Sequence, residues 1–173
     1  MELVDISAPI IPNEGLGGIE LRKGIGDYPH LVNLDTWLSG EMELDMFGPF
    51  RVCYDLPRFG FQIDVDPRNA LITYIKAYAG YAGTLFGQIG VGTLVSEALK
   101  LAPDLYWDEM DSILYSEIHD GVFLGIGGDA PLEKIPSLPI EAIWVYVPKP
   151  NEPKTPPKTH VRWDAEGRPY RLG

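Results

Sequence analysis

Short runs of β-branched and aromatic residues, each ended by glycine, proline or asparagine, recur along the first 147 residues and constrain the fold most. Such residues fit a pleated strand, and the residues between the runs reverse the chain. The clearest hairpin joins residues 61–66 to residues 70–78, with Pro67 presetting one turn dihedral and Asn69 tolerating a left-handed one. The runs that read as strands are GGIELRKGI, FRVCYDL, GFQIDVD, ALITYIKAY, SILYSEI, GVFLGIG and AIWVYV.

One segment, TLVSEALKLAP, has helical character instead. Thr93 is a suitable N-cap, good helix formers continue to Leu101, and Pro103 lies just beyond the end. The sequence therefore predicts an α+β fold, a mainly antiparallel β-sheet with one well-formed helix at about residues 93–101.

A second helical stretch around LVNLDTWLSGEMELD, residues 31–45, is interrupted by Gly40. Within it, EMELDMF alternates charged and apolar side chains with period two, which favours a strand. That strand would carry on one face the carboxylates of Glu41, Glu43 and Asp45.

Charge and proline content divide the chain unevenly. The net charge is -11; residues 148–173 hold six basic and three acidic residues (+3), so residues 1–147 hold eight basic and 22 acidic ones (-14). PKPNEPKTPPKT, residues 148–159, resists helix and sheet and reads as an extended linker or a strap over the body. The sequence predicts a globular α+β domain at 1–147 and a basic, Pro-rich C-terminal extension at 148–173, with a hairpin in HVRWDAEGRPYRLG.

Composition also narrows the partners. Strong negative charge disfavours nucleic acid and anionic membrane and attracts a basic partner. No apolar run approaches the roughly 18 residues of a spanning helix, and the N-terminus lacks the pattern of an export signal. Cys53 is the only cysteine, which excludes an intrachain disulfide and fits a reducing compartment. We expect a cytoplasmic protein without a membrane span.

Familiar ligand-binding patterns fail in detail. The glycines of GTLFGQIGVGT precede a helix, but Val95 stands three residues after Gly92, and no Gly-Lys-Ser/Thr follows. DVDPRNALITYI begins like a calcium loop, yet Asn69 replaces the required glycine and Ile75 the bidentate glutamate. We expect no cofactor and no metal.

Nucleophile and base candidates are equally isolated. His119 followed by Asp120 could form an oriented base, but no Gly-x-Ser-x-Gly elbow supplies a nucleophile. Cys53 lies in an apolar strand, where a buried, inert thiol is expected. The three histidines form no metal-binding pair; they are His30, His119 and His160.

The stretch PDLYWDEMDSILYSEI, residues 103–118, leaves three interpretations open. Two of its carboxylates could act as a glycosidase-type acid and base. It could be a solvated acidic turn between helix and hairpin. It could also be an interface, with aromatic anchors surrounded by steering charges. The residues concerned are Asp104, Tyr106, Trp107, Asp108, Glu109 and Asp111.

From Phe61 to Val147 the chain resembles a bacterial family. The order of elements is ITYIKAYAGYAGTLFGQIGVGT, VSEALKLAP, LYWDEMDSILY, DGVFLGI and IWVYV. It is similar to small immunity proteins of polymorphic-toxin and contact-dependent-inhibition systems, in which a Gly-Tyr/Phe-x-Gly stretch and an Ile-Gly-x-Gly stretch precede a short helix. The resemblance implies a non-enzyme that binds a cognate toxin domain and blocks its active site.

The leading hypothesis is therefore a cytosolic binding protein that neutralises a partner, a toxin domain with a basic surface. An alternative is a small enzyme or ligand-binding domain whose pocket lies between helix and sheet and pairs a carboxylate with His119. A third is an accessory module whose Pro-rich tail docks elsewhere. The partner contacts expected under the first hypothesis are Asp104, Tyr106, Trp107, Asp108, Glu109 and Asp111, with Glu41, Glu43 and Asp45 as a second patch.

Overall fold

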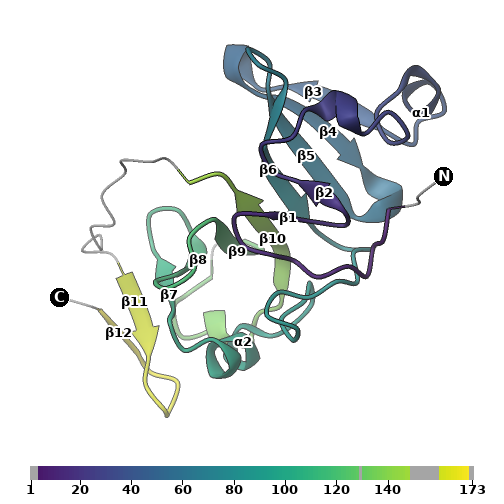
Figure 1. Cartoon of the computed structure of the whole chain (residues 1–173). Helices are drawn as coiled ribbons and strands as arrows, with labels where there is room; N and C mark the ends of the chain where they lie inside the picture. The colour runs from purple at the N-terminus through teal and green to yellow at the C-terminus, as the bar shows by residue number, and fades with distance from the viewer. Residues whose placement is uncertain (1–3, 129, 149–159, 172–173) are drawn as a thin grey trace.

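One sheet of ten antiparallel strands runs through the molecule (Figure 1). The computed structural model describes residues 4–128, 130–148 and 160–171. In their order across the sheet, the strands are β12 (Pro169–Arg171), β11 (His160–Trp163), β7 (Leu105–Asp108), β8 (Ile113–Ser116), β9 (Val122–Ile126), β10 (Ile140–Tyr146), β6 (Leu71–Ala77), β5 (Phe61–Asp66), β4 (Val52–Leu56) and β3 (Glu43–Met46).

Short elements complete the fold. A separate two-stranded hairpin pairs β1 (Gly15–Leu16) with β2 (Ile19–Glu20). No helix in the described part of the chain is long and apolar enough to cross a membrane. The helices are α1 (Leu34–Leu38) and α2 (Val95–Leu101), and the 3-10 turns are η1 (Ile25–Asp27), η2 (Gly48–Phe50), η3 (Pro57–Phe59) and η4 (Ile135–Ser137).

The predicted fold class is confirmed, since the chain is mostly antiparallel sheet with one well-formed helix. Each run predicted as a strand contains or overlaps one, and EMELDMF contains β3. The N-cap of α2 is Leu94, however, and not Thr93. The Thr93 hydroxyl instead accepts a hydrogen bond from the backbone N–H of Gly90 at 3.0 Å, so it stabilises the preceding turn.

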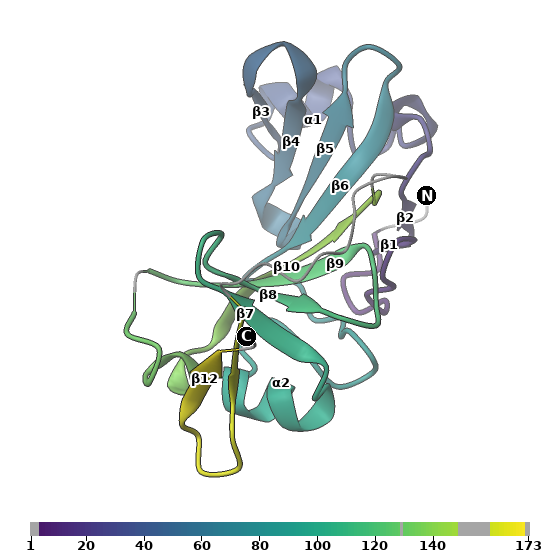
Figure 2. The same ribbon diagram turned by 90° about the vertical axis from the view of Figure 1, so that its left-hand side faces the viewer.

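The two faces of the sheet differ in what covers them. On one face, side chains of the central strands are fully buried against Leu16 and Ile19 of the β1–β2 hairpin and against Val95 and Ala98 of α2. Figure 2 shows α2 below β7 and β8. Each Leu or Ile buried in this way stabilises the fold by about 1.5–3 kcal/mol. The sheet contributes to this core Ile63, Ile75, Leu114, Leu124 and Ile143.

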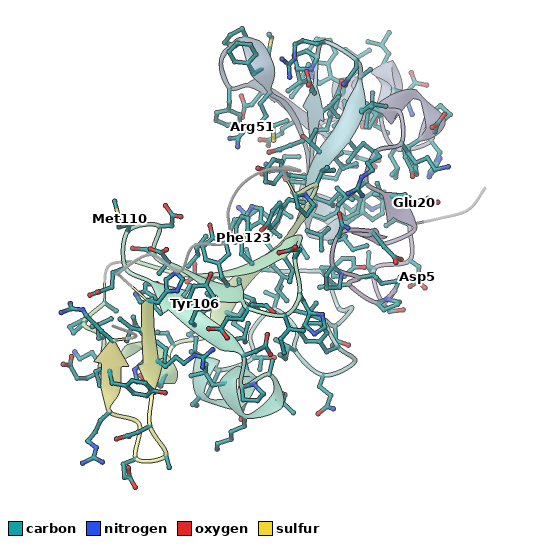
Figure 3. All side chains as sticks on the ribbon, turned by 60° about the vertical axis from the view of Figure 1, so that its left-hand side comes forward. Asp5, Glu20, Arg51, Tyr106, Met110 and Phe123 are labelled. Atoms are coloured by element: carbon teal, nitrogen blue, oxygen red, sulfur yellow. The ribbon has the colours of Figure 1, made fainter. Side chains whose placement is uncertain are left out.

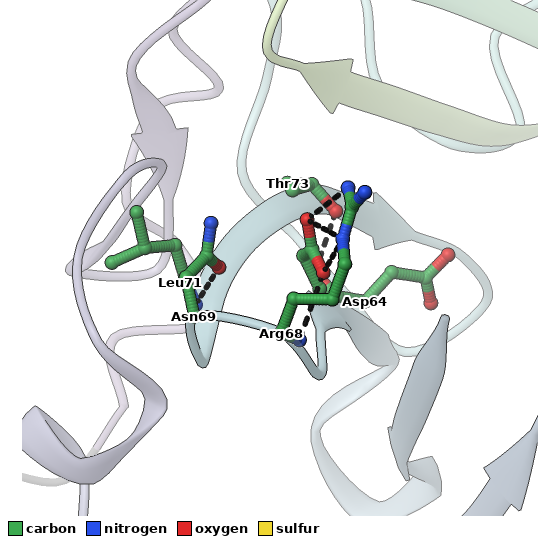
Figure 4. Close-up of polar contacts among 6 residues, drawn as sticks. Asp64, Arg68, Asn69, Leu71 and Thr73 are labelled. Atoms are coloured by element: carbon green, nitrogen blue, oxygen red, sulfur yellow. Dashed lines mark hydrogen bonds and ion pairs between the residues drawn. The ribbon is translucent and has the colours of Figure 1, made fainter. Parts of the chain in front are cut away.

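The turn between β5 and β6 forms the predicted hairpin, but its left-handed residue is Ala70 (φ 59°) and not Asn69. The Asn69 side-chain oxygen accepts a hydrogen bond from Leu71 N at 3.0 Å (Figure 4). The Asp66 carboxylate accepts hydrogen bonds from the Arg68 guanidinium, the closest at 2.7 Å, and from Arg68 N at 3.0 Å. These bonds lower the pKa of Asp66 to about 2, so the turn is held by a carboxylate that stays charged.

The predicted C-terminal hairpin is present as β11 and β12. The Asp164 carboxylate accepts backbone hydrogen bonds from Glu166 and Arg168 at 3.0 and 2.8 Å and so closes the reversal. Because β11 also pairs with β7, residues 160–171 continue the sheet of the body. The predicted Pro-rich linker at residues 149–159 lies outside the described residues.

Gly60 and Gly87 allow the stability cost of a left-handed backbone to be compared with the added cost of steric crowding. Gly60 and Gly87 both have left-handed φ values, 69° and 75°. A Cβ at Gly60 would lie 2.4 Å from Tyr81 N, whereas a Cβ at Gly87 would meet nothing within 4 Å. We expect Gly87→Ala to lower the free energy of unfolding by about 1 kcal/mol and Gly60→Ala to lower it by at least about 2 kcal/mol. Urea unfolding followed by circular dichroism compares them, and equal losses would contradict the crowding at Gly60.

Candidate protein-interaction surface

Strand β7 carries the core of the first predicted contact set, but alternation along a strand sends its side chains to opposite faces. Tyr106 is half-buried on the face that α2 does not cover (Figure 3), whereas Trp107 is in the core, with 5% of its surface exposed. Asp108 is also only 5% exposed. This burial corrects the prediction that Trp107 and Asp108 are surface contacts. Asp104, half-buried, accepts a hydrogen bond from the Ser116 hydroxyl.

The carboxylates of the following turn are largely engaged within the protein. Glu109 accepts two hydrogen bonds from the Arg171 guanidinium, both at 3.0 Å, and this contact lowers the pKa of Glu109. Asp111 is exposed and accepts a hydrogen bond from the Tyr115 hydroxyl at 3.2 Å. The carboxylates of the first set are therefore hydrogen-bonded within the protein, and Asp111 is the most accessible of them.

His160, at the start of β11, is buried against this turn. Its Nε2 lies 3.7 Å from the Asp108 carboxylate, and its ring lies 3.8 Å from the Tyr106 ring, centroid to centroid. Burial lowers the pKa of the imidazole; Asp108 and Glu117 oppose this shift, and Arg162 adds to it. Neither ring nitrogen has a hydrogen-bond partner among the residues that the structure describes. In the sequence, His160 stands apart from the other two histidines, and no local pattern indicates its burial.

Aromatic side chains cross the face opposite the core in a row. Tyr106 and Tyr115 lie 5.9 Å apart between ring centroids, Tyr115 and Phe123 5.8 Å, and Phe123 and Trp144 4.9 Å. A Cβ at Gly125 would lie 2.5 Å from the Trp144 ring, so glycine is required beneath it. We define the aromatic face as the half-buried rings of Tyr74, Tyr106, Tyr115, Phe123, Trp144 and Tyr146.

The second predicted patch lies at the other end of the sheet, on and before the edge strand β3. Glu43 and Asp45 are exposed and share one face of β3, as predicted, whereas Glu41 precedes the strand. Glu41 pairs with Arg58 at 2.9 Å. Glu43 and Asp45 form no ion pair with any residue in the described ranges. They therefore remain available to an external positive charge.

Large apolar side chains are exposed at the same edge of the sheet, and those of Leu44 and Met46 project from the opposite face of β3 to the two carboxylates. Trp37 is 52% exposed, Phe50 64% and Met46 71%, and monomeric proteins rarely leave many such groups together in water. Helix α1 is tied to the approach to β3 by hydrogen bonds from the backbone N–H groups of Glu41 and Met42 to one carbonyl of the helix. We define the α1–β3 surface as the two faces of this sheet edge with α1 and the turn after β3, and it comprises exposed Leu34, Trp37, Leu38, Leu44, Met46, Phe47 and Phe50 with Glu43 and Asp45 on the other face of β3 from Leu44 and Met46.

The arginines beside this surface are already partnered. The Arg51 guanidinium lies 4.5 Å from the centre of the Phe47 ring, and its Nε lies 3.4 Å from the buried Asp64 carboxylate. The Arg68 guanidinium lies 5.5 Å from the centre of the Phe50 ring and pairs with the carboxylate of the β5–β6 turn. Local positive charge is thus compensated, and the two carboxylates of β3 keep the α1–β3 surface acidic as well as apolar.

The residues of the alternative, enzymatic hypothesis do not gather. His119 is exposed in the β8–β9 connection, where its ring lies 4.5 Å from that of Phe86. Cys53 is buried, and burial, with the charges of Asp64 and Asp55, raises the pKa of its thiol to about 12. Over the described part of the chain, no three His, Cys, Asp or Glu side chains are grouped so as to hold a metal ion.

The sequence reasoning missed the apolar part of the α1–β3 surface. The alternation in EMELDMF predicts one apolar face for β3, but Leu44 and Met46 stay exposed because β3 is the last strand of the sheet. A signal was present: Leu34, Trp37 and Leu38 have the i, i+3, i+4 spacing of an amphipathic helix. In the structure that apolar stripe faces solvent.

The buried imidazole of His160 predicts a pH dependence. Its pKa is lowered on folding, so the unfolded chain binds a proton more readily than the folded one. Stability from this group is complete above the ordinary histidine pKa of 6.5 and is lost as the pH falls below it towards the folded value. We expect the unfolding midpoint in urea to fall between about pH 7.5 and 5.5, and His160→Gln to flatten that fall. His119→Gln is the matched exposed control, and an equal flattening there would contradict the assignment.

Comparison with known proteins does not indicate what the α1–β3 surface binds. No family model matches the chain, and no curated protein or solved structure matches it significantly. The resemblance to immunity proteins therefore stays a prediction.

Proposed function

We propose that this chain is a binding protein that neutralises a protein partner, and that the partner is a toxin domain with a basic surface. The observation that carries the proposal is the α1–β3 surface, where Trp37, Met46 and Phe50 are exposed at the last strand of the sheet, and the other face of that strand presents two carboxylates that form no ion pair with a described residue. Buried aromatic anchors supply most of the energy of an interface, and charges beside them steer the encounter. The first predicted set offers less, because Trp107 and Asp108 are buried.

The charge pattern on β3 favours a basic partner over a second copy of this chain. In an antiparallel pairing of two β3 strands, residues facing each other lie on the same side of the sheet. Glu43 would then face Asp45 of the second copy, or one of these residues would face its own counterpart. Like charges directly opposite each other are destabilising, whereas Lys or Arg on a partner would be stabilised there. The net charge of -11 also attracts a positively charged partner over longer distances.

Removal of the apolar anchors tests the proposal. We expect Trp37→Ala combined with Phe50→Ala to weaken binding about tenfold or more, about 1.4 kcal/mol, because both side chains would be buried by the partner. The partner is captured from native cell lysate on the immobilised wild-type protein, identified and purified, and its affinity is measured by surface plasmon resonance. The matched control is Ile118→Ala with Leu101→Ala, two exposed apolar residues elsewhere. An equal loss in both pairs would remove the assigned surface.

Charge reversal tests the steering role separately. We expect Glu43→Lys with Asp45→Lys to slow association and to reduce its dependence on salt, with a smaller effect on dissociation. Glu97→Lys with Glu133→Lys makes the same change in net charge at exposed positions outside the surface and should have the weaker effect.

The neutralising function is then tested by expressing the purified partner's gene in a host with and without this chain. A partner that is harmless alone, or whose toxicity persists in the presence of this chain, would contradict the proposed function.

A further inference from the structure

Strand β3 is the last strand of the sheet, so one side of its backbone has no neighbouring strand in the described part of the chain (Figure 2). The N–H of Phe47 donates to the Arg51 carbonyl at 2.9 Å and continues the register of β3 with β4. Bonded and non-bonded pairs alternate along antiparallel strands, so the backbone groups of Leu44 and Met46 point away from β4. Among the described residues, these outward N–H and C=O groups have no backbone partner.

The opposite edge of the sheet, formed by β12, is protected against such pairing. The N–H of Asp164 donates to the Arg168 carbonyl at 3.0 Å, so by the same alternation the backbone groups of Pro169 and Arg171 point outward. Proline has no N–H to donate, and Arg171 carries a charge held by Glu109. Proline and charged residues are common means of blocking a sheet edge. The two outward residues of β3 are neither.

The side chains of β3 point to two faces of different chemistry. All four residues of the strand are exposed, with Glu43 and Asp45 on one face and Leu44 and Met46 on the other. A group that approaches one face of the sheet leaves the other face uncovered. A strand added beside β3 places alternate side chains on both faces at once, so it fits both when basic and apolar residues alternate along it.

The negative charge on the first face is not balanced within the sheet. Glu43 lies directly opposite Asp55 of β4, and like charges in that position are destabilising. Asp55 accepts a hydrogen bond from the Tyr78 hydroxyl at 2.6 Å, which supplies no positive charge. Glu43, Asp45 and Asp55 form no ion pair with a residue in the described ranges. A Lys or Arg side chain on the free side of β3 would provide the missing counter-charge.

The direction of an added strand follows from the sheet itself. Every described strand pair is antiparallel, and antiparallel pairing is slightly more stable per residue than parallel pairing. In an antiparallel addition, the residues opposite Leu44 and Met46 exchange backbone hydrogen bonds with them and share their apolar face. The residue opposite Asp45 lies on the acidic face, and its own N–H points away from β3.

We propose that β3 binds its partner by accepting an extended segment as an added antiparallel strand, in which Lys or Arg alternates with apolar residues. Backbone hydrogen bonds to the outward groups of β3 provide affinity, and the alternating side chains provide specificity. This inference rests on the proposed function for the identity of the partner, because it describes how the same surface binds. The mode of binding itself is tested without the partner.

A short blocked peptide in which lysine and valine alternate is the probe. The amides of Leu44 and Met46 in the full chain are followed by NMR hydrogen exchange. Without peptide they should exchange about tenfold faster or more than the Asp45 amide, which bonds to β4. Peptide at millimolar concentration should slow both by about tenfold or more and shift their signals. Unchanged exchange and unshifted signals would overturn the proposal, as would equal binding of a peptide with glutamate in place of lysine.

Methylation of the peptide backbone separates strand addition from attraction between charges. Methyl groups on the valine nitrogens remove the donors that face β3, so the dissociation constant should rise about tenfold or more. Methyl groups on the lysine nitrogens are the matched control, because those N–H groups point away from β3, and the dissociation constant should change less than about threefold. Equal losses, no loss in either peptide, or the reverse order, which indicates parallel pairing, would each overturn the proposal.

A proline in β3 applies the same test to the protein. Leu44→Pro removes an outward N–H and keeps the bonds to β4, and proline is tolerated at such positions of edge strands. Leu44→Ala is the control that loses the side chain and keeps the N–H. We expect the proline variant to bind the peptide about tenfold more weakly than the alanine variant, and equal affinities would contradict backbone pairing. Amide signals of β5 and β6 verify the fold, and the methylated peptides decide the question if the proline variant unfolds.

The partner captured from lysate distinguishes failure of this inference from failure of the proposed function. A toxin whose affinity falls with Trp37→Ala and Phe50→Ala but is unchanged by Leu44→Pro would overturn strand addition and leave the proposed function in place. Protection of Leu44 and Met46 by the peptide, together with a partner that is harmless when expressed alone, would support strand addition and contradict the proposed function.

Discussion

Strand β10 is the element on which the rest of the sheet depends, because it is hydrogen-bonded to a neighbour from each half of the chain. On one side it pairs with β6, which belongs to the series β3–β6, and on the other with β9, which belongs to the series β7–β9. Ile143 and Val145 of β10 are fully buried in the shared core. Trp144, between them, projects to the opposite side and packs over Gly125. One strand thus supplies both the backbone connection between the halves and the centre of the aromatic face.

The parts of the fold that sequence predicted are those decided by neighbouring residues. The β5–β6 hairpin, the strand pattern and the C-terminal reversal at Asp164 follow from local turn chemistry and period-two alternation, and all are present. Strand β7 was not predicted, because the acidic residues around Tyr106 resemble a solvated turn. The burial of Trp107 and Asp108 is decided by β11, whose pairing with β7 spans about fifty residues and leaves no local signal. The capping role given to Thr93 failed for a local reason, since its hydroxyl bonds the preceding turn.

The sequence predicted the charged residues of the candidate surface but not its exposed apolar residues, and the difference has a physical reason. Charge is visible in a sequence, so Glu43 and Asp45 could be named; which carboxylates are already partnered is visible only in three dimensions. Glu41, Asp104 and Glu109 each contact another side chain, and their charges are correspondingly less available to a ligand. Exposure of Trp37 and Phe50 could not be predicted either, because the same residues in a central strand or a longer helix would belong to the core. Net charge therefore describes the attraction of the whole molecule, while the position of the surface depends on what the edge of the sheet leaves uncovered.

The pairing of β11 with β7 also has a consequence for synthesis of the chain. Domains fold as the polypeptide emerges, beginning from the N-terminal side. β7, β8 and β9 leave the ribosome well before β11, so the backbone edge of β7 stays without its final neighbour until β11 has emerged. The β3–β6 half has all its strands by residue 77 and can form its hairpins earlier. A ribosome stalled before residue 160 would therefore display an open β7 edge, and such edges are templates for pairing with another chain.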